Sequence, residues 1–530
     1  MSSLQRILSI ITLKPEIGDQ KHESPYVNER GYVDFKSGDA ENPRSWSRTR
    51  RWTITLIAVL LALNGNFSSS IFPGSLDSVV DEFNVSEVVA ALTTTLFLLG
   101  FCTGPFIFAP LSEFYGRRWI FYITFAAYMA FTFLCASPPS FGGLLVGRFL
   151  AGTFISAPLS TTPGVLVDLW DPIERGNATA IFSLASWIGP SIGSVISGFV
   201  QLKRDWRWGV YSALWLGAPT MALMFLIPET HSPTILAQNS KRARRSGITG
   251  AQTEGEENKP KLHQLYKMAL TRPWILMFDL ISLLCSIYAC IVFTLQFMLF
   301  SIYPIVFHEM REWNAGVSQL PLLGQVVGAV LGAIVIFVDS ERRRRRSDAS
   351  GKKLLPEDRL LMAMFGGVGF PITMFWLAWS AQYNQVPWIV PTLAGTFLST
   401  SLMLVYVAII NYLTDTYADY AASVIAANTV TRSAGSAAAP LFTNQMFSAL
   451  GVGGGGSLIG GVATLLAFIP FVFYRYGSSI RRKSKYALVD GDQLDKVDEE
   501  ADPTDYGVQP DETQHAGELS RATADNQPEA

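Results

Sequence analysis

The sequence predicts an all-α polytopic membrane protein whose twelve transmembrane helices form two bundles of six. Its composition gives the first indication, because 49% of the 530 residues are hydrophobic and only 16% are charged. Soluble proteins carry about 25% charged residues. The second indication is a series of twelve apolar runs, each close to the roughly 20 residues that cross a bilayer. Backbone groups find no water inside lipid, so each run is expected to be helical.

The twelve runs fall into two sets of six, separated by a polar segment. They cover approximately residues 53–72, 88–110, 119–137, 143–167, 177–200, 208–228, 274–303, 316–338, 360–380, 387–412, 421–445 and 457–476. We therefore expect an N-terminal tail (1–50), a first bundle (51–228), a linker (229–273), a second bundle (274–476) and an acidic tail (477–530). The polar linker is expected to be solvated and the acidic tail to be disordered.

Lys and Arg predict the orientation, because they concentrate in cytoplasmic loops. Basic clusters precede the first run, follow the second, eighth and twelfth runs, and occur in the linker: Arg44, Arg48, Arg50 and Arg51; Arg117 and Arg118; Arg342 to Arg346; Arg481, Arg482 and Lys483; and Lys241, Arg242, Arg244 and Arg245. The loop 73–87 has four acidic residues and no basic one, and only 201–207 departs from the trend. Both termini are therefore expected in the cytoplasm. The sequon at Asn84 would then lie outside, in a short loop that could receive a glycan.

Several function classes are excluded by what the sequence lacks. A net charge of −2 gives no reason to expect a nucleic-acid partner. The four Cys lie in apolar runs without a CxxC pair, so neither a disulfide framework nor a metal site is supported. No phosphate-binding, dinucleotide-binding or nucleophile motif occurs, so we expect no catalytic residue, no cofactor and no enzyme activity.

The two bundles share a charge pattern that suggests an internal repeat. Glu113 follows the second run and precedes Arg117 by four residues, and Asp339 follows the eighth run and precedes Arg343 by four. Residues four apart lie on one helix face. Transporters are often built from such repeats, with the substrate site near the midplane between them.

Several segments resemble the major facilitator superfamily. They are Ala109–Arg118 (APLSEFYGRR), like its loop 2–3 signature; Leu145–Gly152 (LVGRFLAG), like its arginine motif; and Trp187–Gly193 (WIGPSIG), like the Gly-Pro motif of its antiporters. Asn411–Ser423 and Asn428–Arg432 resemble fungal twelve-span drug:proton antiporters. The similarity covers about 45–476. Two departures stand out: Glu113 replaces the usual Asp, and Asp279 stands where similar fungal exporters have Glu.

The resemblance implies a secondary active transporter in which two bundles rock about a central site. Inward proton movement would drive a small organic molecule out, so the proton gradient supplies the energy. Gly116, Arg117 and Arg118 of the loop signature, with Glu113, would act in a latch on the cytoplasmic side, and Asp339 with Arg343 would form its counterpart. We expect a monomer in the lipid bilayer of the plasma membrane, or alternatively of the vacuole.

Three ionisable residues inside the runs are candidates for the transport pathway, because buried charge is costly and usually functional. Arg148 could couple protons or place an anionic partner, or could snorkel to the interface. Arg432 lies about twelve residues into its run and could line a water-filled cavity or act as a buried clamp. Asp279 could exchange protons, since burial raises a carboxyl pKa, or could be an interfacial residue.

Polar side chains in other runs could line the same cavity. Candidates are Asn66 and Ser69 in the first run, Gln296 and Tyr303 in the seventh, Tyr406 and Asn411 in the tenth, and Asn428 beside Arg432. The alternatives are hydrogen bonds between helices for the polar groups and interface anchoring for the tyrosines. Gly189, Pro190 and Gly193, followed by Gly198, could form a hinge or a seal between the bundles, or simply allow close packing.

The substrate is the least determined part of the prediction. A drug or secondary metabolite ranks first, an organic acid second and a polyamine third, because a dication would require more intramembrane carboxylates than Asp279 alone. A transporter-like sensor that signals through its tail is the rival class, which a short polar tail disfavours.

Overall fold

The computed structural model describes residues 26, 28, 32–36, 38–171, 174–245, 252–253, 256, 262–350 and 355–487. Within this part of the chain, ten helical segments are long and apolar enough to cross a membrane. One of them, Ser423–Arg481, covers all but the first two residues of the eleventh predicted run and all of the twelfth, and α8 (Arg207–Met224) supplies the sixth. The twelve-helix fold class is confirmed. The expected disorder of the acidic tail, 477–530, is wrong for its first residues, because α16 continues to Arg481, which is buried, and the structure describes the chain as far as 487. Residues 488–530 lie outside the described part.

Each half consists of six spans. The N-terminal half contains α2 (Arg48–Ser69), α4 (Glu87–Tyr115), α5 (Arg117–Ala136), α6 (Phe141–Leu169), α7 (Arg175–Gln201) and α8, with a short α3 (Leu76–Phe83) between α2 and α4. The C-terminal half contains α12 (Leu280–Pro304), α13 (Leu323–Ser350), α14 (Leu360–Gln382), α15 (Ile389–Thr416) and α16 (Ala421–Arg481). Two spans are joined in α16, and Gly451 separates them with a non-helical backbone at φ 69°.

Local sequence explains where helices begin. The hydroxyl of Ser140 accepts a hydrogen bond from the Gly143 N–H at 3.2 Å and caps the start of α6. Gly116 adopts φ 93°, which favours glycine, and its turn ends α4 and allows α5 to begin at Arg117.

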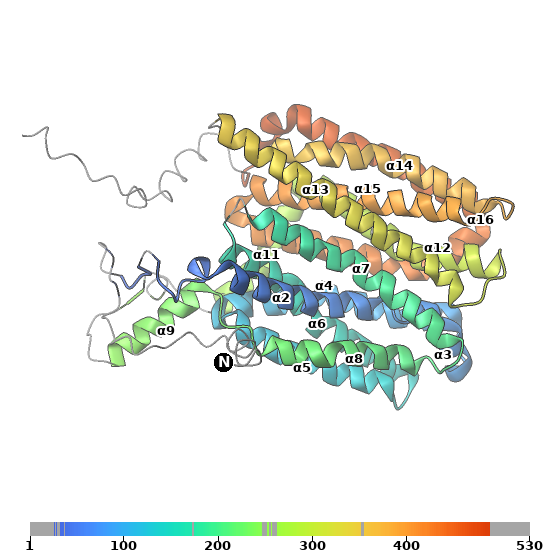
Figure 1. Cartoon of the computed structure of the whole chain (residues 1–530), viewed down its shortest axis with the longest axis horizontal. Coiled ribbons are helices and arrows are strands. Elements are labelled where there is room, and N and C mark those ends of the chain that lie inside the picture. Colours follow the sequence, from blue (N-terminus) through green and yellow to red (C-terminus); the bar gives the residue numbers. More distant parts are fainter. Residues whose placement is uncertain are drawn as a thin grey trace, which may run out of the picture.

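The two halves lie side by side with their helices roughly aligned (Figure 1). The halves contact each other mainly where α4 packs on α16 and where α7 packs on α13. We call the end of the bundle that carries α9 (Ser232–Arg245) and the start of α2 the linker end, and the end that carries α3 the opposite end (Figure 1).

Two helices form within the segment expected to be a solvated linker. The first, α9, packs against the N-terminal segment, where Ala243 and Val33 are buried together. Arg244 pairs with Glu256 at 2.9 Å. Burial alone would raise the pKa of the Glu256 carboxyl, but hydrogen bonds from Arg244 and Ser240 bring that pKa below its usual value.

The second linker helix, α11 (Leu262–Met277), runs into the range expected for the seventh span. That span begins instead at Leu280, six residues later than the predicted start at 274. The reason is a tertiary contact: α11 packs against α4 and α16, with Trp274 stacked on Phe106 at 6.1 Å between ring centroids.

Candidate functional site

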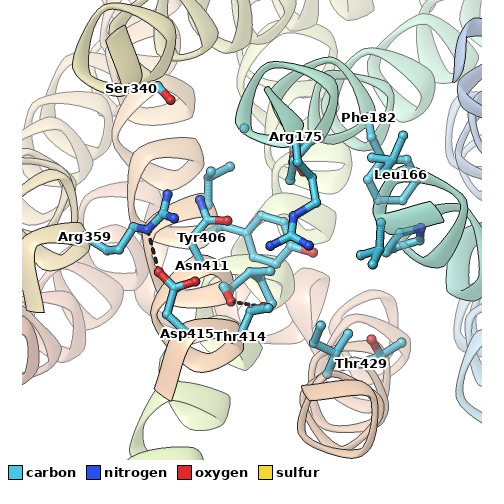
Figure 2. A pocket seen from close by; sticks show the side chains of 18 of the residues that line it. Leu166, Arg175, Phe182, Ser340, Arg359, Tyr406, Asn411, Thr414, Asp415 and Thr429 are labelled. Atoms are coloured by element: carbon cyan, nitrogen blue, oxygen red, sulfur yellow. Dashed lines mark hydrogen bonds and ion pairs between the residues drawn. The ribbon is translucent and has the colours of Figure 1, made fainter. Parts of the chain in front are cut away.

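A cavity of about 310 Å³ lies between the two halves. The N-terminal half contributes α6 and α7 to its wall, and the C-terminal half contributes α13, η5 (Pro356–Arg359), α15 and α16. Figure 2 shows Arg175 of α7 reaching into this space toward Tyr406 and Asn411 of α15. The cavity is therefore bounded by helices that would separate or approach if the halves moved relative to each other.

Arginines dominate the part of the cavity near the linker end. Arg359 pairs with Asp415 at 2.7 Å, as Figure 2 shows, and Arg343 pairs with Asp339 at 2.7 Å. Arg175 and Arg344 also line the cavity. Because the arginines come from the start of α7, the latter part of α13 and η5, and Asp415 comes from the end of α15, these side chains surround the mouth of the cavity at the linker end.

Arg432 marks the inner end of the cavity. Its guanidinium lies 4.5 Å from the ring centroid of Phe293 and 5.8 Å from that of Tyr406. Its Nε is buried without a hydrogen-bond partner, and no acidic side chain of the described residues lies within ion-pair distance of it. The charge is therefore held by aromatic faces, an arrangement that favours a cation.

An aromatic cluster closes the cavity behind Arg432 and joins the two halves. Trp187 of α7 lies 5.2 Å from Phe293 of α12 and 6.0 Å from Tyr406 of α15 between ring centroids. The Phe293 and Tyr406 rings meet edge-on at 4.8 Å. Such ring pairs stabilise their contact by about 0.5–1.5 kcal/mol beyond the burial of their area.

Close packing across the halves seals the opposite end. A Cβ added at Gly198 of α7 would lie 2.7 Å from the carbonyl oxygen of Ala315, and one added at Gly316 would lie 2.7 Å from Phe199. Backbones approach this closely only because glycine has no side chain. The structure therefore shows a cavity that extends to the linker end and is shut at the opposite end.

The loop signature forms contacts that differ from the predicted pair. Glu113 and Arg117 do not share one helix face, because the turn at Gly116 places Arg117 at the start of α5. Arg117 pairs instead with Asp168 of α6 at 3.0 Å. The predicted shared helix face of Glu113 and Arg117 is thus wrong, whereas Asp339 and Arg343 lie on one face of α13 and pair.

Glu229 completes the cluster around the loop signature. Its carboxylate accepts the backbone N–H groups of Arg117 at 2.9 Å and Arg118 at 3.2 Å. Negative charge at a helix N-terminus is stabilising. The same carboxylate lies so close to Gly116 that a Cβ there would be 2.4 Å from its oxygen. The Arg118 side chain donates to the Tyr122 hydroxyl at 2.9 Å.

Arg148 lies outside the cavity, contrary to the prediction of a pathway residue. Its guanidinium donates to the carbonyl oxygens of Thr93 at 3.0 Å and Ser68 at 2.9 Å, and it stacks over Phe97 at 4.0 Å. The side chain is 2% exposed, so it does not snorkel to the interface either. It joins α2, α4 and α6 within one half.

Asp279 also lies outside the cavity. It is the residue before α12, and its carboxylate accepts hydrogen bonds from the hydroxyls of Tyr417 and, at 2.8 Å, Ser484. The expected position inside the span is wrong, because α12 starts at Leu280 and Asp279 immediately precedes it, which favours the alternative of an interfacial residue.

The polar residues of the first span form contacts within the N-terminal half. The amide of Asn66 donates to the Ala62 carbonyl at 3.0 Å, and the Ser69 hydroxyl donates to the Asn66 carbonyl at 2.6 Å. Asn66 and Ser69 are buried and do not line the cavity. Their alternative role in internal hydrogen bonding is the one that the structure supports.

Three further candidates lie behind the cavity wall of the C-terminal half. Gln296 donates to Gln325 at 2.9 Å, and Asn428 contacts the Ser286 hydroxyl at 3.5 Å. Tyr303 is buried and stacks on Phe307 at 5.8 Å. Of the predicted pathway residues, only Tyr406, Asn411 and Arg432 line the cavity.

The glycines of α7 divide into two groups. A Cβ at Gly189 would lie 2.8 Å from Asn66 and one at Gly193 would lie 2.5 Å from the Phe67 carbonyl, so both pack against α2. The carbonyl of Pro190 accepts a hydrogen bond from Ser70 at 2.6 Å. These three residues pack within one half rather than sealing the bundles, and Gly198 makes the contact between halves.

Sequence reasoning missed several residues of the site. Arg175, Arg359 and Asp415 line the mouth of the cavity, and Asp168 and Glu229 surround the loop signature. All five lie near the ends of apolar runs, where charged residues commonly mark the membrane boundary. Residue type therefore gave no signal, and only the packing of the helices distinguishes them.

Known proteins with similar sequences come from one family. Residues 54–440 match the Major Facilitator Superfamily. The efflux pump FUBT of Fusarium oxysporum is 38% identical over 486 residues, covering 91% of this chain and 81% of that protein. The multidrug transporter mdrA of Aspergillus fumigatus is 35% identical over 477 residues, covering 89% and 78%.

Solved structures share the fold. The proton:xylose symporter XylE, bound to 6-bromo-6-deoxy-D-glucose, matches with a TM-score of 0.58 and 15% identity, covering 81% of this chain and 96% of that one. At this identity the likeness concerns the arrangement of helices alone.

Proposed function

Because the chain belongs to the major facilitator superfamily, we propose that it is a proton-driven exporter of a small organic molecule, such as a drug or secondary metabolite. The observation that supports this proposal most directly is the cavity between the halves, which extends to the linker end and is shut at the opposite end. The family and the efflux pumps among its relatives support a secondary transporter that is not an enzyme. The linker end faces the cytoplasm in this proposal.

Transport proceeds by alternating access. In the state described here, a molecule enters the cavity from the cytoplasm and reaches Arg432. Export then requires that the contacts of Trp187 and Gly198 with the C-terminal half open while α7 and α13 close together near the mouth. Gly176 and Ser340 already lie close there, since a Cβ on Gly176 would be 3.0 Å from the Ser340 hydroxyl.

Asp415 is the group that we assign to proton coupling in place of Asp279. It is the one acidic residue among the described side chains that line the cavity, and its carboxylate is paired with Arg359 at 2.7 Å. Closure of the mouth would change the surroundings of this pair. A carboxyl group whose partner changes between two states can bind a proton in one state and release it in the other.

Everted vesicles test the proposal. Vesicles that contain the protein should accumulate a panel of drugs and metabolites when the interior is acidic, and vesicles without the protein should not. Flux that persists unchanged without the pH gradient would remove proton coupling. Absence of protein-dependent flux for every compound would remove export.

A further inference from the structure

We propose that the substrate is an amphipathic organic carboxylate, which places its anionic group on Arg432 and its apolar body against the wall formed by α6 and α7. This inference rests on the proposed export function and specifies its substrate class. It follows from the charge balance of the cavity, the geometry of Arg432 and the unequal character of the two walls.

The charge balance of the cavity favours an anion. Its described lining holds five arginines, at positions 175, 343, 344, 359 and 432, and one acidic residue, Asp415. Arg359 already forms an ion pair with Asp415 at 2.7 Å, and Arg343 forms one with Asp339. A cleft lined by one sign of charge raises the local concentration of ions of the opposite sign. The mouth would therefore collect anions and repel a polyamine.

The guanidinium of Arg432 is held in position to bind an anion. Phe293 and Tyr406 lie against its guanidinium, so the side chain is held by rings, and its buried Nε has no hydrogen-bond partner. A guanidinium binds a carboxylate through two parallel N–H···O bonds. A charge this deep in a span requires a polar partner, and none of the described acidic residues supplies one. The substrate carboxylate would do so.

The two walls of the cavity explain the amphipathic part of the proposal. On the N-terminal side, Leu159, Leu166 and Phe182 present apolar surface, as Figure 2 shows for Leu166 and Phe182, and Arg175 is the one arginine of the described lining on that side. On the C-terminal side, Asn411 and Thr429 accompany the other four arginines, beside the apolar Val407, Ile410 and Ile425. A molecule that bridges these walls needs a hydrophobic body and a charged group at one end.

Equilibrium dialysis with the full-length protein in lipid nanodiscs tests this assignment. The probes are matched sets on several aromatic scaffolds: 2-naphthoate, indole-3-acetate and biphenyl-4-carboxylate, each with its neutral carboxamide and its aminomethyl cation. Empty nanodiscs measure partition into lipid. On at least one scaffold the carboxylate should bind about tenfold more tightly than the amide, equivalent to about 1.4 kcal/mol, and the cation should bind most weakly.

Variants connect this preference to Arg432. Arg432→Gln should lower carboxylate affinity by about tenfold and amide affinity much less, so that the preference for the carboxylate is lost, and Arg432→Lys should retain part of the preference. Arg345→Gln is the matched control, since Arg345 is exposed, pairs with Glu341 and does not line the cavity. Thermal unfolding of each variant shows whether it is folded.

Three outcomes would overturn the inference. They are equal or tighter binding of amide or cation on every scaffold, equal loss of carboxylate binding in Arg345→Gln, and no carboxylate binding up to about 1 mM. Failure of export is a separate result: carboxylates that bind in nanodiscs without protein-dependent flux in vesicles would reject the proposed function and retain the site. Gradient-driven flux of neutral compounds alone would retain the proposed export function and reject the carboxylate site.

Discussion

Substitution of Gly198 by alanine should shift the protein toward the state that is open at the opposite end. The added Cβ would lie 2.7 Å from the carbonyl oxygen of Ala315 and 2.7 Å from Cγ of Gln319. Overpacking of this kind costs about 1–3 kcal/mol. The cost applies only while the halves touch here, so the equilibrium should move by roughly 5- to 150-fold.

Double electron–electron resonance measures this shift directly. Spin labels at Lys203 and Glu309, two exposed positions near the opposite end on different halves, report the separation of the halves. Gly461→Ala is the matched control, because no heavy atom lies within 4 Å of its added Cβ. Gly198→Ala should increase the population at longer distance and Gly461→Ala should not. Unchanged distances in Gly198→Ala would refute the reasoning that this contact seals the cavity.

Three further predictions concern charged contacts. Asp168→Asn should weaken the pair with Arg117, lowering the free energy of unfolding by about 1.5–3 kcal/mol, with a fall in the thermal midpoint as the measure; no change would contradict the ion pair. Glu357→Gln should lower the free energy of unfolding by about 3–5 kcal/mol, since it removes the carboxylate charge that lies 2.9 Å from Nε of the buried Arg481; a midpoint equal to that of the unmodified protein would contradict this. Asp415→Asn should abolish the dependence of vesicle flux on the pH gradient, and retained dependence would reject Asp415 as the coupling group.

The sequence predicts the fold well because membrane spans are defined by length and apolar composition, which are local properties. The sequence places the start of the seventh span at 274, whereas the span begins at Leu280, for a tertiary reason: the end of α11 is apolar enough to extend the run, yet α11 packs on α4 and α16 as a separate helix. Of the two charge pairs that suggest an internal repeat, the structure forms one as expected. Asp339 and Arg343 pair as expected, but the backbone turn at Gly116 redirects Arg117 to Asp168.

Two arginines that the sequence places within spans have different surroundings in the structure. Arg148 and Arg432 are both deep in spans, and the cost of burying charge identifies both as unusual. The structure separates them by their surroundings: carbonyl oxygens of neighbouring helices satisfy Arg148, whereas Arg432 faces the cavity beside aromatic rings. Which helices approach each arginine is a property of tertiary packing, and the sequence alone carries no local sign of it.

Cysteine accessibility at Thr429 tests the central claim, that the cavity between the halves is the transport pathway, most directly. Thr429 lines the cavity next to Arg432 on α16, so Thr429→Cys places a thiol inside it. In vesicles of defined orientation, a membrane-impermeant thiol reagent should modify this cysteine from the linker side, and a transported compound should slow the reaction. A cysteine that reacts from neither side, or that reacts equally fast with and without the compound, would contradict the account.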